Sequence, residues 1–209
     1  MILSRLYLLL LIVILFGAGC ANVNKSYPER AYYQFEIQYD STPLTPIKGT
    51  VVAVKRFSVS PGSEGTEFIY RTGDFQYQTD FYNQFFRPPG SLLTEAATRW
   101  FTEAGIFEDV LGQLSQVFPN YVIEGNVIRL FGDYRNQGAP KAVLEIQLFL
   151  LKMDTDNDDP TVLIGTTYSV EKPVPSTEPA ALMRGWSLAL EEILGEFLKD
   201  VQSKYRGHS

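Results

Sequence analysis

The 209-residue sequence predicts a single α+β domain, in which two helices pack on one face of a mainly antiparallel sheet. Segments 91–104 and 179–204 have apolar residues at helical spacing, whereas the segments around them have the alternation and the β-branched or aromatic content of strands. The order is therefore strands, helix, strands, helix. With 45% hydrophobic and 20% charged residues the composition is that of a folded chain, and this length accommodates one domain with appendages.

Two hairpins are expected among the strands. Residues 68–71 and 75–77 place aromatic side chains at alternate positions on both sides of Thr72-Gly73-Asp74, which predicts a hairpin with a tight glycine-containing turn. Residues 121–131 and 142–153 flank a loop that contains glycine and proline, which predicts a second hairpin. Further strands are expected at 31–39, 50–59, 106–110 and 161–170.

Both helices are expected to pack on the sheet through an apolar stripe. Pro88-Pro89-Gly90 ends the extended region before the first helix, and Gly105 fits the position that follows a helix end. The second helix has Pro179 in its first turn, where its missing N–H costs nothing. Trp100 and Trp186 lie on the two stripes, so we expect them in the core and not in a cofactor site.

Charge and histidine content exclude several classes of function. A net charge of −6 with no basic run is unfavourable for binding nucleic acid. The one histidine, His208, lies in the C-terminal tail, which argues against His-dependent hydrolases and His-ligated zinc sites. The acidic run 154–159 lacks the glycine and the glutamate of a calcium loop, so it is expected to be a solvated hairpin tip. We expect no enzyme, no metal and no cofactor.

The aromatic residues between positions 68 and 86 are the main candidate for a functional surface. Ordinary core packing accounts for many aromatic side chains in a domain of this size. Eight rings are nevertheless more than one hairpin face needs, so we hypothesise that part of this segment is exposed and binds a partner. Arg71, at the end of a strand, adds a cation that can stack on a ring or bind an anion. The candidate residues are Tyr70, Arg71, Phe75, Tyr77, Phe81, Tyr82, Phe85 and Phe86.

The first 20 residues have the pattern of a secretory signal. Arg5 precedes an unbroken apolar run over 6–16, and small residues then lead to Cys20, the only cysteine in the sequence. This arrangement resembles the lipobox of bacterial lipoproteins, which implies that residues 1–19 are removed and that Cys20 is lipidated, with palmitate among its acyl chains. A plain signal peptide with an incidental cysteine and an uncleaved anchor are the alternatives.

The residues that follow Cys20 indicate a destination and a tether. By resemblance to bacterial sorting rules, Ala21 implies delivery to the periplasmic face of the outer membrane. Residues 20–30 are polar with a proline and would form the lipidated tether. The domain itself is expected to span residues 31–205.

The chain between Tyr32 and Lys204 resembles the auxiliary lipoproteins of ABC-type transport systems, the family of the paraquat-inducible lipoprotein and of partners of MCE (mammalian cell entry) transporters. The features that carry this resemblance are the predicted lipidated Cys20, the Tyr32-Tyr33 strand, the strand at 51–54, the Phe68-Ile69-Tyr70-Arg71 strand, the Pro88-Pro89 turn into a helix, and the GIFEDV stretch at 105–110.

The resemblance implies a fold like the N-terminal domain of TolB and a non-enzymatic role in lipid transport. The implied partners are an MCE-type periplasmic protein, an ABC permease and an ATPase, with the lipoprotein docking the tunnel or substrate-binding partner at the membrane. The alternative is an envelope-assembly lipoprotein, such as a pilotin or a regulator of cell-wall synthases. Self-association into a homo-oligomer stays open.

Overall fold

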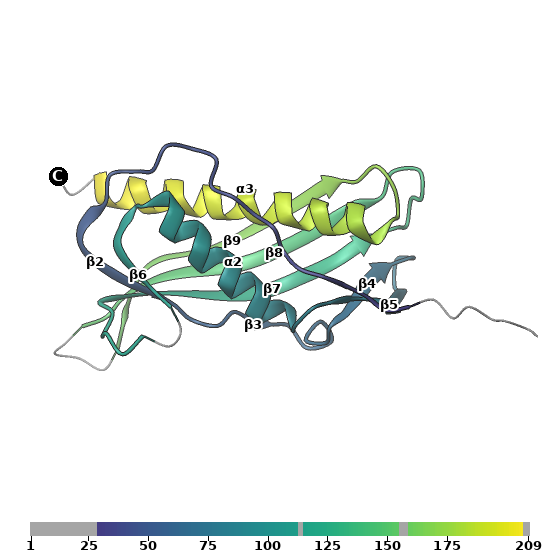
Figure 1. Ribbon diagram of the computed structural model, residues 1–209, viewed down its shortest axis with the longest axis horizontal. Helices are drawn as coiled ribbons and strands as arrows, with labels where there is room; N and C mark the ends of the chain where they lie inside the picture. Colours follow the sequence, from purple (N-terminus) through teal and green to yellow (C-terminus); the bar gives the residue numbers. More distant parts are fainter. Residues whose placement is uncertain (1–28, 113–114, 155–158, 207–209) are drawn as a thin grey trace, which may run out of the picture.

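The computed structural model describes residues 29–112, 115–154 and 159–206, and this part of the chain forms a nine-stranded sheet with two helices over one face (Figure 1). The α+β prediction is confirmed. In chain order the elements are β1 (Ala31–Tyr33), β2 (Ile47–Val54), β3 (Ser58–Val59), β4 (Glu67–Arg71), β5 (Tyr77–Phe85), α2 (Pro89–Ala104), β6 (Phe107–Leu111), β7 (Tyr121–Asp133), β8 (Lys141–Lys152), β9 (Thr161–Pro173) and α3 (Pro179–Arg206).

The sheet is mixed, but its longest ladders are antiparallel, so the expectation of a mainly antiparallel sheet is confirmed. Strands β7, β8 and β9 form long antiparallel ladders, and β4 pairs antiparallel with β5. The short strands β2, β3 and β4 all pair parallel with β7, while β6 is parallel to β2 and β1 to β5. Antiparallel hairpins are visible in a sequence because their loops are short, whereas parallel pairings join segments far apart in the chain.

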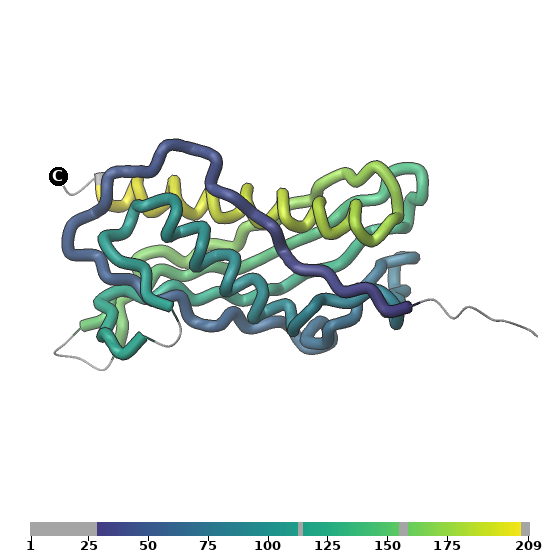
Figure 2. Tube along the Cα trace, in the orientation of Figure 1, coloured from purple at the N-terminus to yellow at the C-terminus, as the bar shows by residue number. Residues whose placement is uncertain are grey.

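The segment predicted as a strand over 31–39 pairs with the sheet only at β1, and the remainder crosses over the helices (Figure 2). The backbone N–H of Glu36 donates to Ser187 Oγ of α3 at 3.3 Å, and that of Gln38 donates to Glu191 Oε1 at 3.2 Å. Alternate side chains are buried, including Phe35 at 4% exposure. The alternating pattern was therefore real, but helix side chains accept the hydrogen bonds that a neighbouring strand would have accepted.

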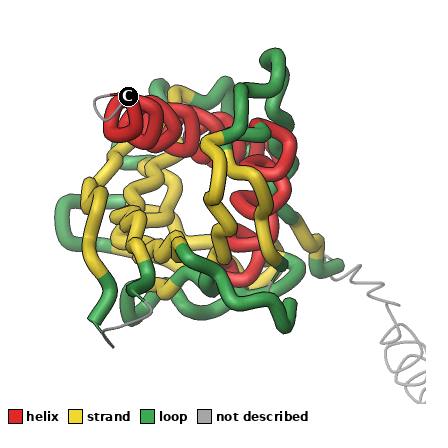
Figure 3. The backbone as a smooth tube through the Cα atoms, turned by 90° about the vertical axis from the view of Figure 1, so that its left-hand side faces the viewer, coloured by secondary structure: helices red, strands yellow, loops and turns green. Residues whose placement is uncertain are grey.

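Both helices bury their apolar stripes against the same face of the sheet, as Figure 3 shows end-on, and the rings of Phe101 and Phe197 meet between them at 5.8 Å. Gly105 ends α2 in the left-handed conformation, with φ of 65°. The expectation that Trp100 and Trp186 lie in the core is confirmed, since both are almost completely buried. The indole N–H of Trp186 donates to backbone carbonyl oxygens of β7 and β8.

The acidic run at 154–159 connects β8 to β9, and these strands are antiparallel neighbours as a hairpin requires. Residues 155–158 themselves lie outside the described part of the chain, as do Cys20 and the predicted signal and most of the tether at 1–28. None of the described helices is long and apolar enough to cross a membrane.

Candidate interaction surface

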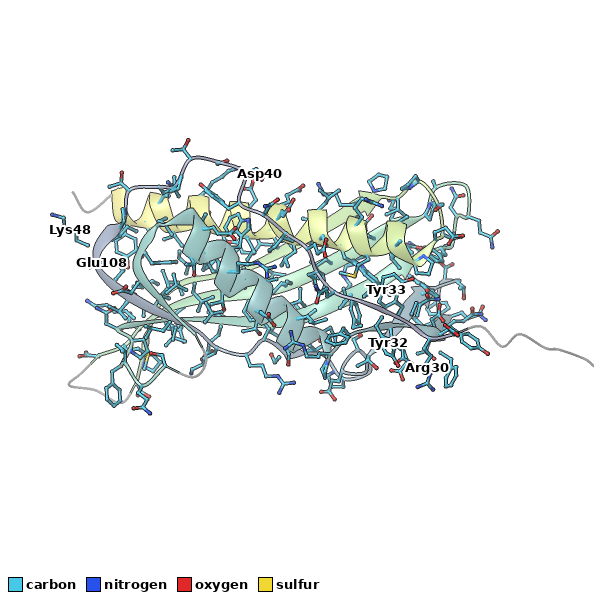
Figure 4. The ribbon with its side chains drawn as sticks, viewed as in Figure 1. Arg30, Tyr32, Tyr33, Asp40, Lys48 and Glu108 are labelled. Carbon is cyan, nitrogen blue, oxygen red and sulfur yellow. The ribbon has the colours of Figure 1, made fainter. Side chains whose placement is uncertain are left out.

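Exposed aromatic side chains gather on β1, on β5 and on the segments that adjoin β5. We call these six residues the ring surface: Tyr32 at 54% exposure, Phe75 at 100%, Tyr77 at 53%, Phe81 at 58%, Tyr82 at 38% and Phe86 at 62%. Their strands lie at one end of the molecule, opposite the end at which α3 finishes (Figure 1). In Figure 4 the labelled Arg30, Tyr32 and Tyr33 lie at this end, and Lys48 and Glu108 at the other. Five of the six belong to the predicted candidate set.

A bulge in β5 projects two of these rings out of the sheet. Glu67 of β4 pairs with Gln84 of β5, but the next residue of β4, Phe68, pairs with Asp80. Residues 81–83 are therefore extra residues on β5 with no partner on β4, and they loop out of the ladder. The rings of Phe81 and Tyr82 leave the sheet at this loop and contact each other edge-to-face at 5.3 Å.

The carboxylate of Asp80 holds the bulge in shape. Its Oδ1 accepts hydrogen bonds from the backbone N–H groups of Tyr82 and Asn83, at 2.9 and 3.0 Å. Its Oδ2 accepts from the Tyr70 hydroxyl at 2.7 Å and from the Asn83 side-chain amide at 2.8 Å. Four hydrogen bonds to one carboxylate fix the backbone of the loop, so the two exposed rings are presented by a rigid support.

The same network keeps its tyrosines protonated. Burial, and next the hydrogen bond to Asp80, raise the pKa of Tyr70 well above its ordinary value. Burial also raises the pKa of Tyr134, which stacks on Tyr70 at 4.9 Å, to about 12. Burial pushes the pKa of Asp80 up, but the hydrogen bonds from Tyr70 and Asn83 and from the backbone outweigh it, so the net shift is downward. The carboxylate stays charged and the phenols stay neutral at neutral pH, which are the protonation states that these hydrogen bonds require.

The turn before β5 exposes Phe75 completely. Arg71 donates from Nε to the carbonyl oxygen of Gly73 at 3.3 Å and from Nη2 to that of Asp74 at 2.9 Å, which fixes the turn. The Arg71 guanidinium also lies 5.9 Å from the centre of the Tyr77 ring, so the predicted stacking of this cation on an aromatic side chain is observed. Arg71 therefore supports the surface from below and does not form its contact face.

Two of the predicted candidates do not belong to an exposed surface. Phe85 is 3% exposed and contacts Phe35, Phe68 and Trp186, so its assignment to a binding surface was wrong and it is a core residue. Tyr70 is half-buried beneath the bulge. The bulge explains the position of Phe85, because its extra residues change which side chains of β5 face the helices, and a simple alternation along the strand cannot anticipate this change. Tyr70 belongs to β4, where its hydroxyl donates to Asp80 at 2.7 Å.

A groove beside Tyr32 and Phe86 was not predicted. It runs between the crossing segment after β1 and helix α3, and has a volume of about 680 Å³. The rings of Tyr32 and Phe86 form an edge-to-face pair at 6.5 Å at its rim. The full lining is Tyr32, Tyr33, Gln34, Glu36, Phe86, Ala180, Met183, Arg184 and Ser187. The sequence indicated only the aromatic side chains of this groove, because the residues of α3 that line it come close to β1 only in the folded protein.

The groove contains the kinds of side chain that are common at protein interfaces. Aromatic, Met and Arg side chains are enriched at protein interfaces, and all three kinds line this groove. Among the described residues no group of three or more His, Cys, Asp or Glu is placed to hold a metal ion. The groove is open and mixed in character, with aromatic rings beside the polar side chains of Gln34, Glu36, Arg184 and Ser187.

No family model matches the chain, and no curated protein matches its sequence. Among solved structures, protein XCC0632 from Xanthomonas campestris, described as DUF330, superposes with a TM-score of 0.69 at 19% identity, over 86% of this chain and 100% of that one. An uncharacterised protein gives 0.56 at 16% identity, over 81% of this chain and 99% of that one. Lipoprotein GNA1162 from Neisseria meningitidis gives 0.37 at 14% identity, over 70% and 99%. The first two show a shared fold alone; the third value is too low to support an inference.

Proposed function

We propose that this protein is a lipid-anchored, non-enzymatic docking component of an ABC/MCE-type lipid transport system in the bacterial envelope. The observation that carries this proposal is the exposed Tyr32–Phe86 pair at the rim of an open groove, at the end of the domain where the chain leads back to Cys20. A groove in this position would hold a partner close to the membrane to which Cys20 is attached.

The anchor is the first part of the proposed mechanism. Acylation of Cys20 would supply several buried chains, which is sufficient for stable attachment to a bilayer. Ala21 favours the periplasmic face of the outer membrane. The short tether at 20–30 would then restrict the domain to a thin layer above that surface.

The partner is the second part. An MCE-type periplasmic protein would seat a segment in the groove, with apolar side chains against Tyr32, Phe86 and Met183 and an acidic group facing Arg184. A few buried aromatic and Arg contacts commonly dominate the binding free energy of such an interface. The permease and the ATPase of the system would be separate chains, because the sequence has no phosphate-binding loop.

A pull-down from native membranes tests this proposal. In the full chain, Tyr32→Ser combined with Phe86→Ser removes both rim rings, which are exposed and contribute little to the core. Phe118→Ser is the matched control, since Phe118 is 94% exposed and lies outside the groove. After crosslinking we expect the MCE-type partner to be captured with the unsubstituted chain and the control, and lost from the double variant.

Thermal unfolding of all three proteins shows whether a loss of capture reflects binding or folding. An unchanged unfolding midpoint with lost capture supports the groove as the docking site. Capture of the same partner by the double variant would contradict it. Capture of secretion or cell-wall synthesis proteins in place of transport proteins would favour the envelope-assembly alternative.

A further inference from the structure

We propose that three of the exposed rings, Phe75, Phe81 and Tyr82, rest in the headgroup region of the membrane that holds the lipid anchor and so fix the orientation of the domain. This inference rests on the anchor of the proposed function, but it concerns residues outside the docking groove. We call these three residues the membrane-contact rings.

The structure presents the membrane-contact rings as rigid projections. Phe75 stands at the tip of a turn that Arg71 fixes, and Phe81 and Tyr82 stand on the bulge that Asp80 fixes. Their exposed fractions are 100%, 58% and 38%. A large apolar side chain that is held out of the protein by dedicated hydrogen bonds is better explained by something it contacts than by the packing of the domain.

The path of the chain brings these rings close to Cys20. Strand β1 pairs parallel with β5 so that Ala31 lies opposite Asn83, within the bulge. The guanidinium of Arg30 lies over the ring of Phe81, 4.1 Å from its centre. Ten residues separate Arg30 from Cys20, which reach about 35 Å when fully extended and about 17 Å as a flexible chain. A lipid on Cys20 therefore keeps the bulge within a short distance of the bilayer.

The chemistry of this end suits a lipid surface. Tyr side chains are enriched at the boundary between headgroups and acyl chains, and Phe is among the apolar residues that interfacial segments bury at that boundary. Arg30 adds a positive charge next to Phe81 that complements lipid phosphates. The nearby Asp74 carboxylate lies 3.3 Å from Arg135, which also pairs with Asp133 at 2.6 Å, so one positive charge is shared between two carboxylates.

A bilayer is the occupant that the shape of the surface favours. A protein partner recognises rings most readily where they line a groove, and the membrane-contact rings line neither the groove between the segment after β1 and α3 nor the hollow at Tyr70, Asp80 and Tyr134. Rings that project from a turn and a bulge need no complementary shape when the opposite surface is fluid. The protein partner thus belongs to the groove, and the bilayer to the membrane-contact rings.

A fluorescence experiment on the full, acylated chain tests the inference. Phe81→Trp places a reporter on the bulge, and Phe118→Trp places a more exposed reporter, at a position with 94% exposure against 58%, outside the membrane-contact rings. Trp100 and Trp186 are buried, so the emission of the unsubstituted chain serves as background. Each protein is reconstituted on phosphatidylethanolamine–phosphatidylglycerol vesicles with and without phosphatidylcholine brominated near the top of its acyl chains. We expect the bromine to lower the emission of the Phe81→Trp reporter about two-fold and to leave that of Phe118→Trp unchanged.

Two outcomes overturn the inference in distinguishable ways. If the protein floats with the vesicles but the Phe81→Trp reporter is not quenched, and Phe75→Trp gives the same result, the rings do not contact lipid. If the emission of the Phe81→Trp or Phe75→Trp reporter changes only when the MCE-type partner is added, and not with brominated lipid, the rings belong to a protein interface. If the unsubstituted chain floats no better than Cys20→Ser, the anchor itself is absent, and the proposed function fails together with the inference.

Discussion

The Asp80→Ala substitution is the sharpest test of how the ring surface is built. It removes a carboxylate that accepts four hydrogen bonds, from Tyr70, from the side chain of Asn83, and from the backbone of Tyr82 and Asn83. A hydrogen bond contributes a net stabilisation of about 0.5–1.5 kcal/mol in general, and more when the acceptor is charged. Because Asp80 is partly exposed to solvent, we take a value near the low end for each of the four bonds, which gives a total of about 3 kcal/mol. We expect the free energy of unfolding to fall by roughly that amount.

Urea unfolding of the full chain, followed by circular dichroism, measures this loss. Tyr70→Phe is the matched control, because it removes one of the four hydrogen bonds and keeps the ring in place; it should cost about 1 kcal/mol. The double variant should lose less than the sum of the two single losses, since both act on one network. A loss below about 0.5 kcal/mol for Asp80→Ala would refute the reasoning, because ordinary surface substitutions reach that value.

The pH dependence of the same pair of proteins gives an independent check. The pKa of Asp80 is lowered in the folded protein, so its stabilisation is complete above the pKa of the unfolded chain, about 3.9. As the pH falls through the lower folded-state pKa, the carboxylate becomes protonated and this contribution disappears. The stabilities of the unsubstituted chain and of Asp80→Ala should therefore converge in acid. A constant difference down to the acid limit would show that charge plays no part.

Three further predictions concern glycines and a tyrosine. Gly125→Ala should lower the free energy of unfolding by about 1–3 kcal/mol in urea, because the new methyl group would lie 2.6 Å from the buried ring of Phe57. Gly105→Ala should cost only about 1 kcal/mol by the same measurement, because its φ of 65° strains alanine while space around the methyl group is ordinary. The unsubstituted chain should lose stability between about pH 10 and about pH 12, where Tyr134 ionises in the unfolded but not in the folded chain, and Tyr134→Phe should lessen that decline in alkaline unfolding titrations. Equal losses of unfolding free energy for Gly125→Ala and Gly105→Ala would contradict the glycine assignments. Equal slopes of stability against pH for the unsubstituted chain and Tyr134→Phe would contradict the tyrosine assignment.

Periodicity was sufficient to locate the elements that bury one continuous face. The apolar stripe of α2 and the glycine at its end are both local features, and the observed helix extends the predicted range by two residues at its start. The β7–β8 ladder was equally visible, because its strands are long and its loop contains turn-forming residues. These features depend on contacts between near neighbours in the sequence.

Features that depend on tertiary partners were not accessible in this way. The segment after β1 alternates like a strand, but Ser187 and Glu191 of a helix 150 residues later accept its hydrogen bonds. The parallel pairings around β7 likewise involve strands that no local pattern links. A buried face shows in the sequence, whereas the identity of the element that covers it does not.

Only part of the candidate surface could be predicted, because the rest of it also depends on tertiary contacts. The surplus of aromatic residues correctly indicated exposed rings at Phe75, Tyr77, Phe81, Tyr82 and Phe86. The core position of Phe85 follows from a bulge that appears only when β5 pairs with β4, whose Tyr70 donates one of the stabilising hydrogen bonds. The groove depends on side chains of α3 that meet β1 only in the folded protein.

Both proposals depend on the lipid at Cys20, and metabolic labelling tests it most directly. Cells that express the full chain receive a clickable fatty acid, and the purified protein is examined for the label beside a Cys20→Ser variant. The chain has one cysteine, so a thioether-linked diacylglyceryl group has a single site. We expect label on the unsubstituted protein and none on Cys20→Ser. An unlabelled wild-type chain, or label that persists in Cys20→Ser, would contradict a lipid-anchored docking protein.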